Sequence, residues 1–471
     1  MKKLAQNMDY QKFKNAKNLS EMLGQIPAAF FETILFCLLA FYCLSPVFIV
    51  ALLNLGITFF NPVFLLLQVG YVSIIFTVLL AYKRFSERTQ KESLKKWIVI
   101  KFPFLFLGAV VVWAILSTLF SSNIELSFFG DYYRKEGLLT IGAYAGIFTG
   151  MLSIHDEKLK FKIIQIFVCP ATVLGAVVIF QYFGLPIKSI VYQFGVNDDK
   201  PYILWAGIFH NINHYGYYLS LAVMATGGLF IFATRKGWLL IYGLAYGLLT
   251  WVLVANNTFG SFLGVAAALV VTIVAFFYRK EKIKKSALLL LVFLAIAFTV
   301  NGIIGQVGTN VNTLTVDMKE IAQSSNEKAS EEIINLAKNA GSGRWQLWMG
   351  ALKIMEEKPL FGTGPDNMAT SYADLGLNWD RPHNEFLQIG ASFGIPALIF
   401  YLLALIFGYA YGYKHLSALP QSSVIAFSAC TGYLFSALFG NTMYYTYPYF
   451  LMFLAIAFSR KPTKELHENP Y

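Results

Sequence analysis

A short polar stretch near residue 380 contains the residue types that acid–base chemistry needs. Asp380, Arg381, Pro382, His383 and Asn384 stand here, and an apolar run follows a few residues later. With Asp380 as N-cap and Pro382 in the first turn, we expect His383 in the first turn of a helix. The positive end of a helix dipole disfavours imidazolium, so the sequence predicts a neutral His383 that accepts a proton near neutral pH.

The same helix start also suits anionic ligands. Backbone N–H groups at a helix N-terminus bind phosphate, and Arg381 beside them offers a guanidinium that matches phosphate geometry. The stretch therefore combines a proton acceptor with an anion site.

Metal-ligating patterns are weak in this chain. No Asp-x-Asp or Glu-x-Asp pair occurs in an expected external loop, and adjacent carboxylates such as Asp198 and Asp199 are ordinarily solvated. His210 and His214 are four residues apart and would share one helical face, but no neighbouring Glu or Asp completes a metal site. We expect no metal and no cofactor, and structural or substrate-contacting roles for the two histidines.

The elements that position these residues are predicted to be membrane helices. Of 471 residues, 57% are hydrophobic and 13% are charged, whereas soluble domains carry about a quarter charged residues. Only helices or closed barrels satisfy the backbone in a bilayer, and the apolar runs are long enough to be helices. The predicted fold class is all-α and polytopic, with about 12 transmembrane helices. They lie near 28–54, 60–82, 98–120, 137–154, 162–183, 212–233, 238–255, 259–278, 286–303, 391–411, 421–440 and 446–459.

The positive charges between these runs predict an orientation. Lys and Arg near span ends stay on the cytoplasmic side, and five connections rich in them fall on one side, with both termini. The chain then divides into a cytoplasmic N-terminal segment, nine helices, an external loop domain of short helices that contains His383, three helices and a cytoplasmic tail. The bounds are 1–27, 28–303, 304–390, 391–459 and 460–471.

The net charge of +11 does not indicate a nucleic-acid protein. The basic residues cluster in short connections instead of along one face, so we interpret them as topology signals and lipid headgroup contacts. All four cysteines, Cys37, Cys43, Cys169 and Cys430, fall inside apolar runs without ligand spacing, which indicates packing residues.

The external loop contains one clear amphipathic pattern. Trp345, Trp348, Met349, Leu352 and Met355 recur three and four residues apart, which predicts an apolar helical face. Such a helix either lies in the membrane interface or packs against the rest of the external domain.

The residues around His383 resemble the His-Asn signature of the O-antigen ligase and O-antigen polymerase superfamily. The resemblance covers residues 381–388 and 394–396, the preceding stretch 343–365, and weaker echoes at 131–138 and 207–213. The order of these motifs and the topology match the superfamily over nearly the whole chain.

This resemblance implies a metal-independent glycosyltransferase of the GT-C type in the cytoplasmic membrane of a bacterium. The donor would be a polyprenyl-pyrophosphate-linked glycan and the acceptor a glycan or a lipid. The essential His maps onto His383, and the phosphate-binding candidates are Arg344, Arg381, Arg134 and Asn384. Many members carry Ser-Arg-Gly at the start of span eight, where this chain has Asn-Thr-Phe-Gly-Ser at 257–261, so Arg134 or Lys200 would have to replace that Arg.

The alternative to a transferase is an exporter or flippase of polysaccharide or lipid-linked glycan. Such a protein would show polar residues along a central path, whereas Glu32, close to its helix start, is the clearest charge inside a span. No internal repeat supports a transporter either. Within the enzyme class, the sequence leaves polymerase and ligase equally open.

Overall fold

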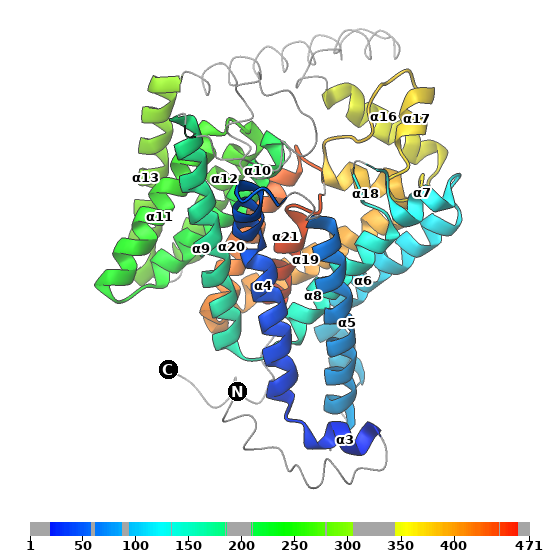
Figure 1. The fold of residues 1–471 in the computed structure, drawn as a ribbon, viewed down its shortest axis with the longest axis horizontal. Coiled ribbons are helices and arrows are strands. Elements are labelled where there is room, and N and C mark those ends of the chain that lie inside the picture. Colours follow the sequence, from blue (N-terminus) through cyan, green and yellow to red (C-terminus); the bar gives the residue numbers. More distant parts are fainter. Residues whose placement is uncertain are drawn as a thin grey trace.

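The computed structural model describes residues 19–57, 62–86, 94–132, 134–183, 185, 209, 211–277, 280–304, 344–441 and 443–459. Within these ranges all regular elements are helices, and one occupies each predicted span position, which confirms the all-α prediction (Figure 1). These helices are α4 (Ala28–Asn54), α5 (Pro62–Ser86), α6 (Leu94–Leu119), α8 (Leu138–Ser153), α9 (Glu157–Tyr182), α10 (Ile212–Phe232), α11 (Lys236–Ala255), α12 (Phe259–Phe277), α13 (Lys280–Ile304), α19 (Ile395–Lys414), α20 (Gln421–Ala437) and α21 (Tyr447–Phe458).

Eight of the described helices are long and apolar enough to cross a membrane by length and composition. Three more are apolar but shorter, namely Pro103–Leu119, Leu138–Ser153 and Tyr447–Phe458. The last of these is buried along nearly its whole length, so its partners are other helices instead of lipid. The chain is therefore a polytopic membrane protein whose central helices need not match the bilayer thickness themselves.

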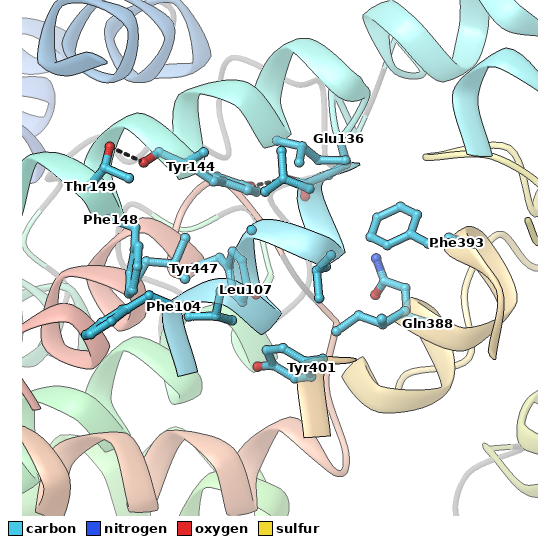
Figure 2. A pocket seen from close by; sticks show the side chains of 18 of the residues that line it. Phe104, Leu107, Glu136, Tyr144, Phe148, Thr149, Gln388, Phe393, Tyr401 and Tyr447 are labelled. Atoms are coloured by element: carbon cyan, nitrogen blue, oxygen red, sulfur yellow. Dashed lines mark hydrogen bonds between the residues drawn. The ribbon is translucent and has the colours of Figure 1, made fainter. Parts of the chain in front are cut away.

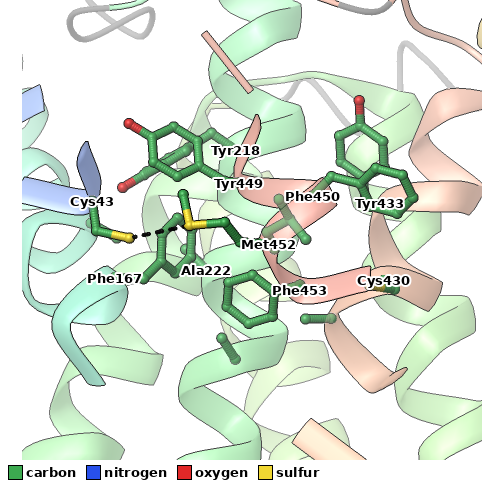
Figure 3. Packing of buried hydrophobic residues seen from close by; sticks show 14 of the residues in the cluster. Cys43, Phe167, Tyr218, Ala222, Cys430, Tyr433, Tyr449, Phe450, Met452 and Phe453 are labelled. Atoms are coloured by element: carbon green, nitrogen blue, oxygen red, sulfur yellow. Dashed lines mark hydrogen bonds between the residues drawn. The ribbon is translucent and has the colours of Figure 1, made fainter. Parts of the chain in front are cut away.

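An aromatic core joins the central helices. The ring of Phe167 in α9 lies 5.1 Å from Tyr218 of α10 and 5.0 Å from Phe453 of α21, both edge to face (Figure 3). Cys43 and Cys430 are buried in this region, and Cys43 contacts the sulfur of Met452 at 3.9 Å. These two cysteines therefore pack as apolar side chains, as the sequence predicts.

Glu32 joins three segments at one end of the helical bundle. Its carboxylate accepts a hydrogen bond from Arg84 of α5 at 2.6 Å and from the backbone N–H groups of His155 and Asp156 at 2.9 and 3.1 Å. These three donors balance the buried charge, because an unpaired carboxylate would be costly there. Glu32 thus connects α4 and α5 to the turn between α8 and α9.

The short helices form a layer at the opposite end from that turn. They are α7 (Ile124–Phe129), α16 (Arg344–Glu357), α17 (Ala369–Asp374) and α18 (Glu385–Phe393). Helix α16 buries Leu347, Ala351 and Ile354 against Tyr372 and α18, so it packs against its neighbours in this layer. Of the predicted apolar face only Met355 is buried there, since Trp345, Trp348 and Met349 are half-buried and Leu352 is 45% exposed.

The predicted start of span ten at residue 391 is also wrong. Gly394 has φ +94°, and this left-handed residue ends α18 before α19 begins at Ile395. A side chain at position 394 would collide with the carbonyl of Leu360. The domain division stays a prediction, and residues 305–343 of the external loop lie outside the described ranges.

Labelling of single cysteines with a membrane-impermeant reagent tests the orientation. In a cysteine-free background, Asn378→Cys should react from outside intact cells, whereas Ser417→Cys should react only after the membrane is opened. Both residues are exposed, so access depends on the side of the membrane. Outside labelling at Ser417→Cys would contradict the orientation.

Candidate functional site

Asp366 joins two segments that are far apart in the sequence. Its carboxylate accepts hydrogen bonds from Arg381 at 2.5 Å and from the backbone N–H groups of Asp131 and Glu136 at 2.7 and 3.1 Å. Both charged side chains are almost fully buried, at 4% and 2% exposed. The loop before α8 and the stretch before α18 are thereby held together. No motif predicted Asp366 as a site residue. Its only distinctive sequence feature is that it follows the Gly-Pro turn.

A second ion pair lies beside the first. The guanidinium of Arg134 donates two hydrogen bonds to Asp380, with Nε–Oδ2 at 2.6 Å and Nη2–Oδ1 at 3.2 Å. Burial alone would raise the pKa of Asp380, but the pairing with Arg134, together with the nearby Arg381 and His383, lowers that pKa below its ordinary value. Arg134 and Arg381, predicted from separate motifs, are therefore both brought to His383.

Asn384, and not Asp380, caps the helix that follows. Its side-chain oxygen accepts a hydrogen bond from the N–H of Leu387 at 3.1 Å, and α18 starts at Glu385. Asp380 is instead the partner of Arg134, and His383 lies just before the cap with φ +52°. The helix therefore starts four residues later than predicted, and His383 precedes it instead of lying in its first turn. Asn384 supports the structure by capping.

The His383 ring is fixed by two neighbours. Its Nδ1 lies 3.2 Å from the side-chain amide of Asn441, and Trp379 packs edge-on at a centroid distance of 5.6 Å. Asn441 comes from the turn between α20 and α21, 58 residues further along the chain. No sequence pattern pointed to it. The orientation of the Asn441 amide decides which nitrogen of the His383 ring carries the proton. If the amide turns by 180°, its carbonyl oxygen takes the place of its amino group and faces Nδ1.

His383 is neutral in this environment. Burial and the positive charges of Arg344 and Arg134 lower the pKa of His383 to about 4, against the opposing effect of Asp380. The sequence predicted the same direction but attributed it to the helix dipole. The structure gives a different cause, because the ring precedes the helix.

Arg344 begins α16 and differs from the other two arginines. It forms no hydrogen bond or ion pair with the part of the chain that the structure describes, yet its charge acts on His383. The indole N–H groups of Trp345 and Trp348, on the same first turns, are buried without a hydrogen-bond partner there. Arg344 thus stands at a helix N-terminus, a position that favours an anion.

Two further carboxyl groups are buried next to this cluster. Glu136 accepts a hydrogen bond from Tyr144, and Glu385 accepts one each from Tyr401 and Tyr433 at 2.8 and 3.1 Å. Burial raises the pKa of both carboxyl groups to about 7, although Arg381 opposes this at Glu136. Neither residue was predicted, because a single Glu near a span has no distinctive spacing.

Backbone strain concentrates in the same place. Of the four described non-glycine residues with positive φ, three belong to this cluster: Lys135, Asp366 and His383, at +56°, +54° and +52°. Such conformations cost about 1–3 kcal/mol each and persist only where the surroundings impose them. They are a feature that functional sites often show.

The remaining sequence candidates do not join the cluster. His214 is buried in α10 with its ring 6.1 Å from that of Tyr217. Asp198, Asp199, Lys200 and His210 lie outside the described residues. Among the residues that are described, no group of three or more His, Cys, Asp and Glu could hold a metal ion.

Comparison with known families supports the relationship that the motifs suggest. The family model described as O-antigen ligase matches residues 219–402, from α10 to α19, and so includes Arg344, Asp366 and His383. Over these residues the chain is similar to the O-antigen ligase family. This similarity agrees with the resemblance that the motifs around His383 suggest. No curated protein matches the chain.

The contribution of the Arg134–Asp380 pair can be tested by a double-mutant cycle. Arg134→Ala, Asp380→Ala and the double variant should show a coupling of about 1 kcal/mol in unfolding free energy, reduced because Asp380 is partly exposed. Denaturation of the four purified proteins in detergent measures their unfolding free energies and thus the coupling. Additive single effects would mean that the pair does not hold the loop in place.

Proposed function

We propose that this protein transfers a polyprenyl-pyrophosphate-linked glycan to an acceptor hydroxyl at the external face of the bacterial cytoplasmic membrane, without a metal ion. The similarity of residues 219–402 to the O-antigen ligase family supports glycosyl transfer. The observation that carries the proposal is a neutral His383 that is fixed by Asn441 and lies close to Arg344. Arg344 has no acidic partner among the described residues.

His383 is the proposed general base. With the carbonyl of Asn441 turned towards Nδ1–H, Nε2 keeps its lone pair and accepts the proton of the acceptor hydroxyl. The buried carbonyl oxygen of Asn441 has no hydrogen-bond partner among the described residues, so this orientation would give it one. Asn441 then acts as a positioning residue.

Arg344 is the proposed ligand of the pyrophosphate. Arg134 and Arg381 are paired with Asp380 and Asp366, whereas Arg344 is not paired with any described residue. Negative charge grows on the leaving group as the glycosidic bond breaks, so a fixed cation stabilises the transition state more than the ground state. The unpartnered indole N–H groups of Trp345 and Trp348 add two donors beside it.

The proposed step is a direct displacement. The acceptor oxygen forms a bond to the anomeric carbon while the bond from that carbon to the pyrophosphate oxygen breaks. The bonding electrons leave with the polyprenyl pyrophosphate, and the hydroxyl proton passes to His383. Displacement from the opposite face inverts the anomeric configuration.

Donor binding should make His383 a better base. The pyrophosphate brings negative charge towards Arg344 and weakens the effect that lowers the pKa of His383. A general base is most effective when its pKa approaches the working pH. The free protein would therefore hold a weak base that strengthens when donor binds.

The variant His383→Gln tests the base directly. Transfer by purified protein from a lipid-linked donor, assayed in excess EDTA, should lose roughly 10²- to 10⁴-fold in kcat, with donor binding preserved. In the wild type, protonation of the base at low pH removes activity, so kcat/KM should fall below about pH 4, the pKa of His383 in the free protein. The fall in kcat should lie at higher pH, because it reports the donor complex.

His415→Gln is the matched control, since His415 lies between α19 and α20, outside the cluster. It should keep wild-type turnover. If His383→Gln kept it too, His383 would only orient other groups. Loss of wild-type turnover in EDTA, restored by a divalent cation, would contradict metal independence.

A further inference from the structure

A cavity of about 360 Å³ adjoins the cluster, between α6 and α8 (Figure 2). The residues of α8 that line it run from Ile141 to Leu152, and Glu136 lines it just before the helix. From Ile141 to Leu152 the helix advances by about 16 Å at 1.5 Å per residue. The cavity therefore follows most of the length of α8, with one end at the cluster.

The walls of the cavity are mainly apolar. Phe104 and Leu107 of α6 face Phe148 and Leu152 of α8, and Leu451 of α21 adds to the lining. The hydroxyl of Thr149 is already used, because it donates to the carbonyl of Ala145 at 2.7 Å. A sugar would lose its hydrogen bonds to water here without replacing them. A hydrocarbon chain would be stabilised, because burial of its apolar surface is favourable. The shape and lining suit one lipid chain.

The external end of the cavity carries carboxyl groups. Glu136 and Asp366 line it, together with the side-chain amide of Gln388. The nearest cation, Arg381, is already paired with Asp366. No Lys or Arg lines the cavity in the described part of the chain, so a phosphate would find no cation in its wall, whereas a hydroxyl can donate a hydrogen bond to Glu136. The end therefore favours an uncharged, hydroxyl-bearing head.

We propose that this cavity binds a hydrocarbon chain of an uncharged lipid whose head carries hydroxyl groups, and that this lipid is the acceptor. The acceptor role rests on the proposed glycosyl transfer. Asp366 lines the cavity and binds Arg381, two residues before His383, so the lipid head lies on the same side as the proposed base. One head hydroxyl forms the bond to the anomeric carbon, and its proton passes to His383 as the pyrophosphate leaves.

Gly108 offers a way to fill the cavity. It lines the cavity from α6, and a Cβ at this position would meet no heavy atom within 4 Å. Gly108→Leu should therefore occupy the space without a backbone clash. Gly247 in α11 is equally open and does not line the cavity, so Gly247→Leu is the matched control.

The probe is a photoreactive monoacylglycerol, compared in nanodiscs with a lysophosphatidic acid of the same chain. The monoacylglycerol should crosslink to residues 138–152 at least fivefold more than the phosphate lipid does. Gly108→Leu should remove most of this crosslinking, and Gly247→Leu should leave it unchanged. Stronger labelling by the phosphate lipid, or equal labelling in Gly108→Leu, would overturn the lipid site.

Transfer assays separate the acceptor role from the function itself. Wild-type protein should glycosylate the monoacylglycerol, and Gly108→Leu should lose most of that product. Transfer to a soluble glycan only, unaffected by Gly108→Leu, would overturn the acceptor role while leaving the glycosyltransferase proposal intact. If no acceptor is glycosylated while the monoacylglycerol still crosslinks, the proposed function fails and the lipid site stands.

Discussion

The buried carboxylate of Asp366 is the constraint on which the external layer depends. It needs several donors to remain charged away from water, and they come from Arg381 and from the backbone before α8. Removing one partner of such a buried pair typically costs about 3–5 kcal/mol. The loop before α8 and the stretch before α18 are therefore held together as one unit.

The position of His383 follows from this unit. Its backbone is left-handed, Asn384 caps the next helix immediately after it, and Arg381 fixes the chain two residues before it. The ring then meets Asn441 from the turn before α21. Because each contact comes from a different segment, the site exists only when the helices are assembled. The same assembly leaves an apolar cavity beside α8.

The sequence predicted the helices well because long apolar runs have few alternatives in a bilayer. Its local motifs also named His383, Arg134, Arg344 and Arg381 as residues of one site. It missed Asp366, Glu136 and Asn441, since each is a single polar residue whose partners lie far along the chain. It misplaced the cap before α18 because Asp380 and Asn384 are both good caps, and only the ion pair with Arg134 decides between them.

Hydrogen exchange of the Asp366→Asn variant is the most direct test that one carboxylate holds the site together. The substitution keeps the side-chain shape but leaves Arg381 buried without its ion pair. Measured by mass spectrometry alongside turnover, residues 131–136 and 380–384 should exchange faster and transfer should fall, while α10 stays protected. Unchanged exchange in both segments with normal transfer would contradict the account.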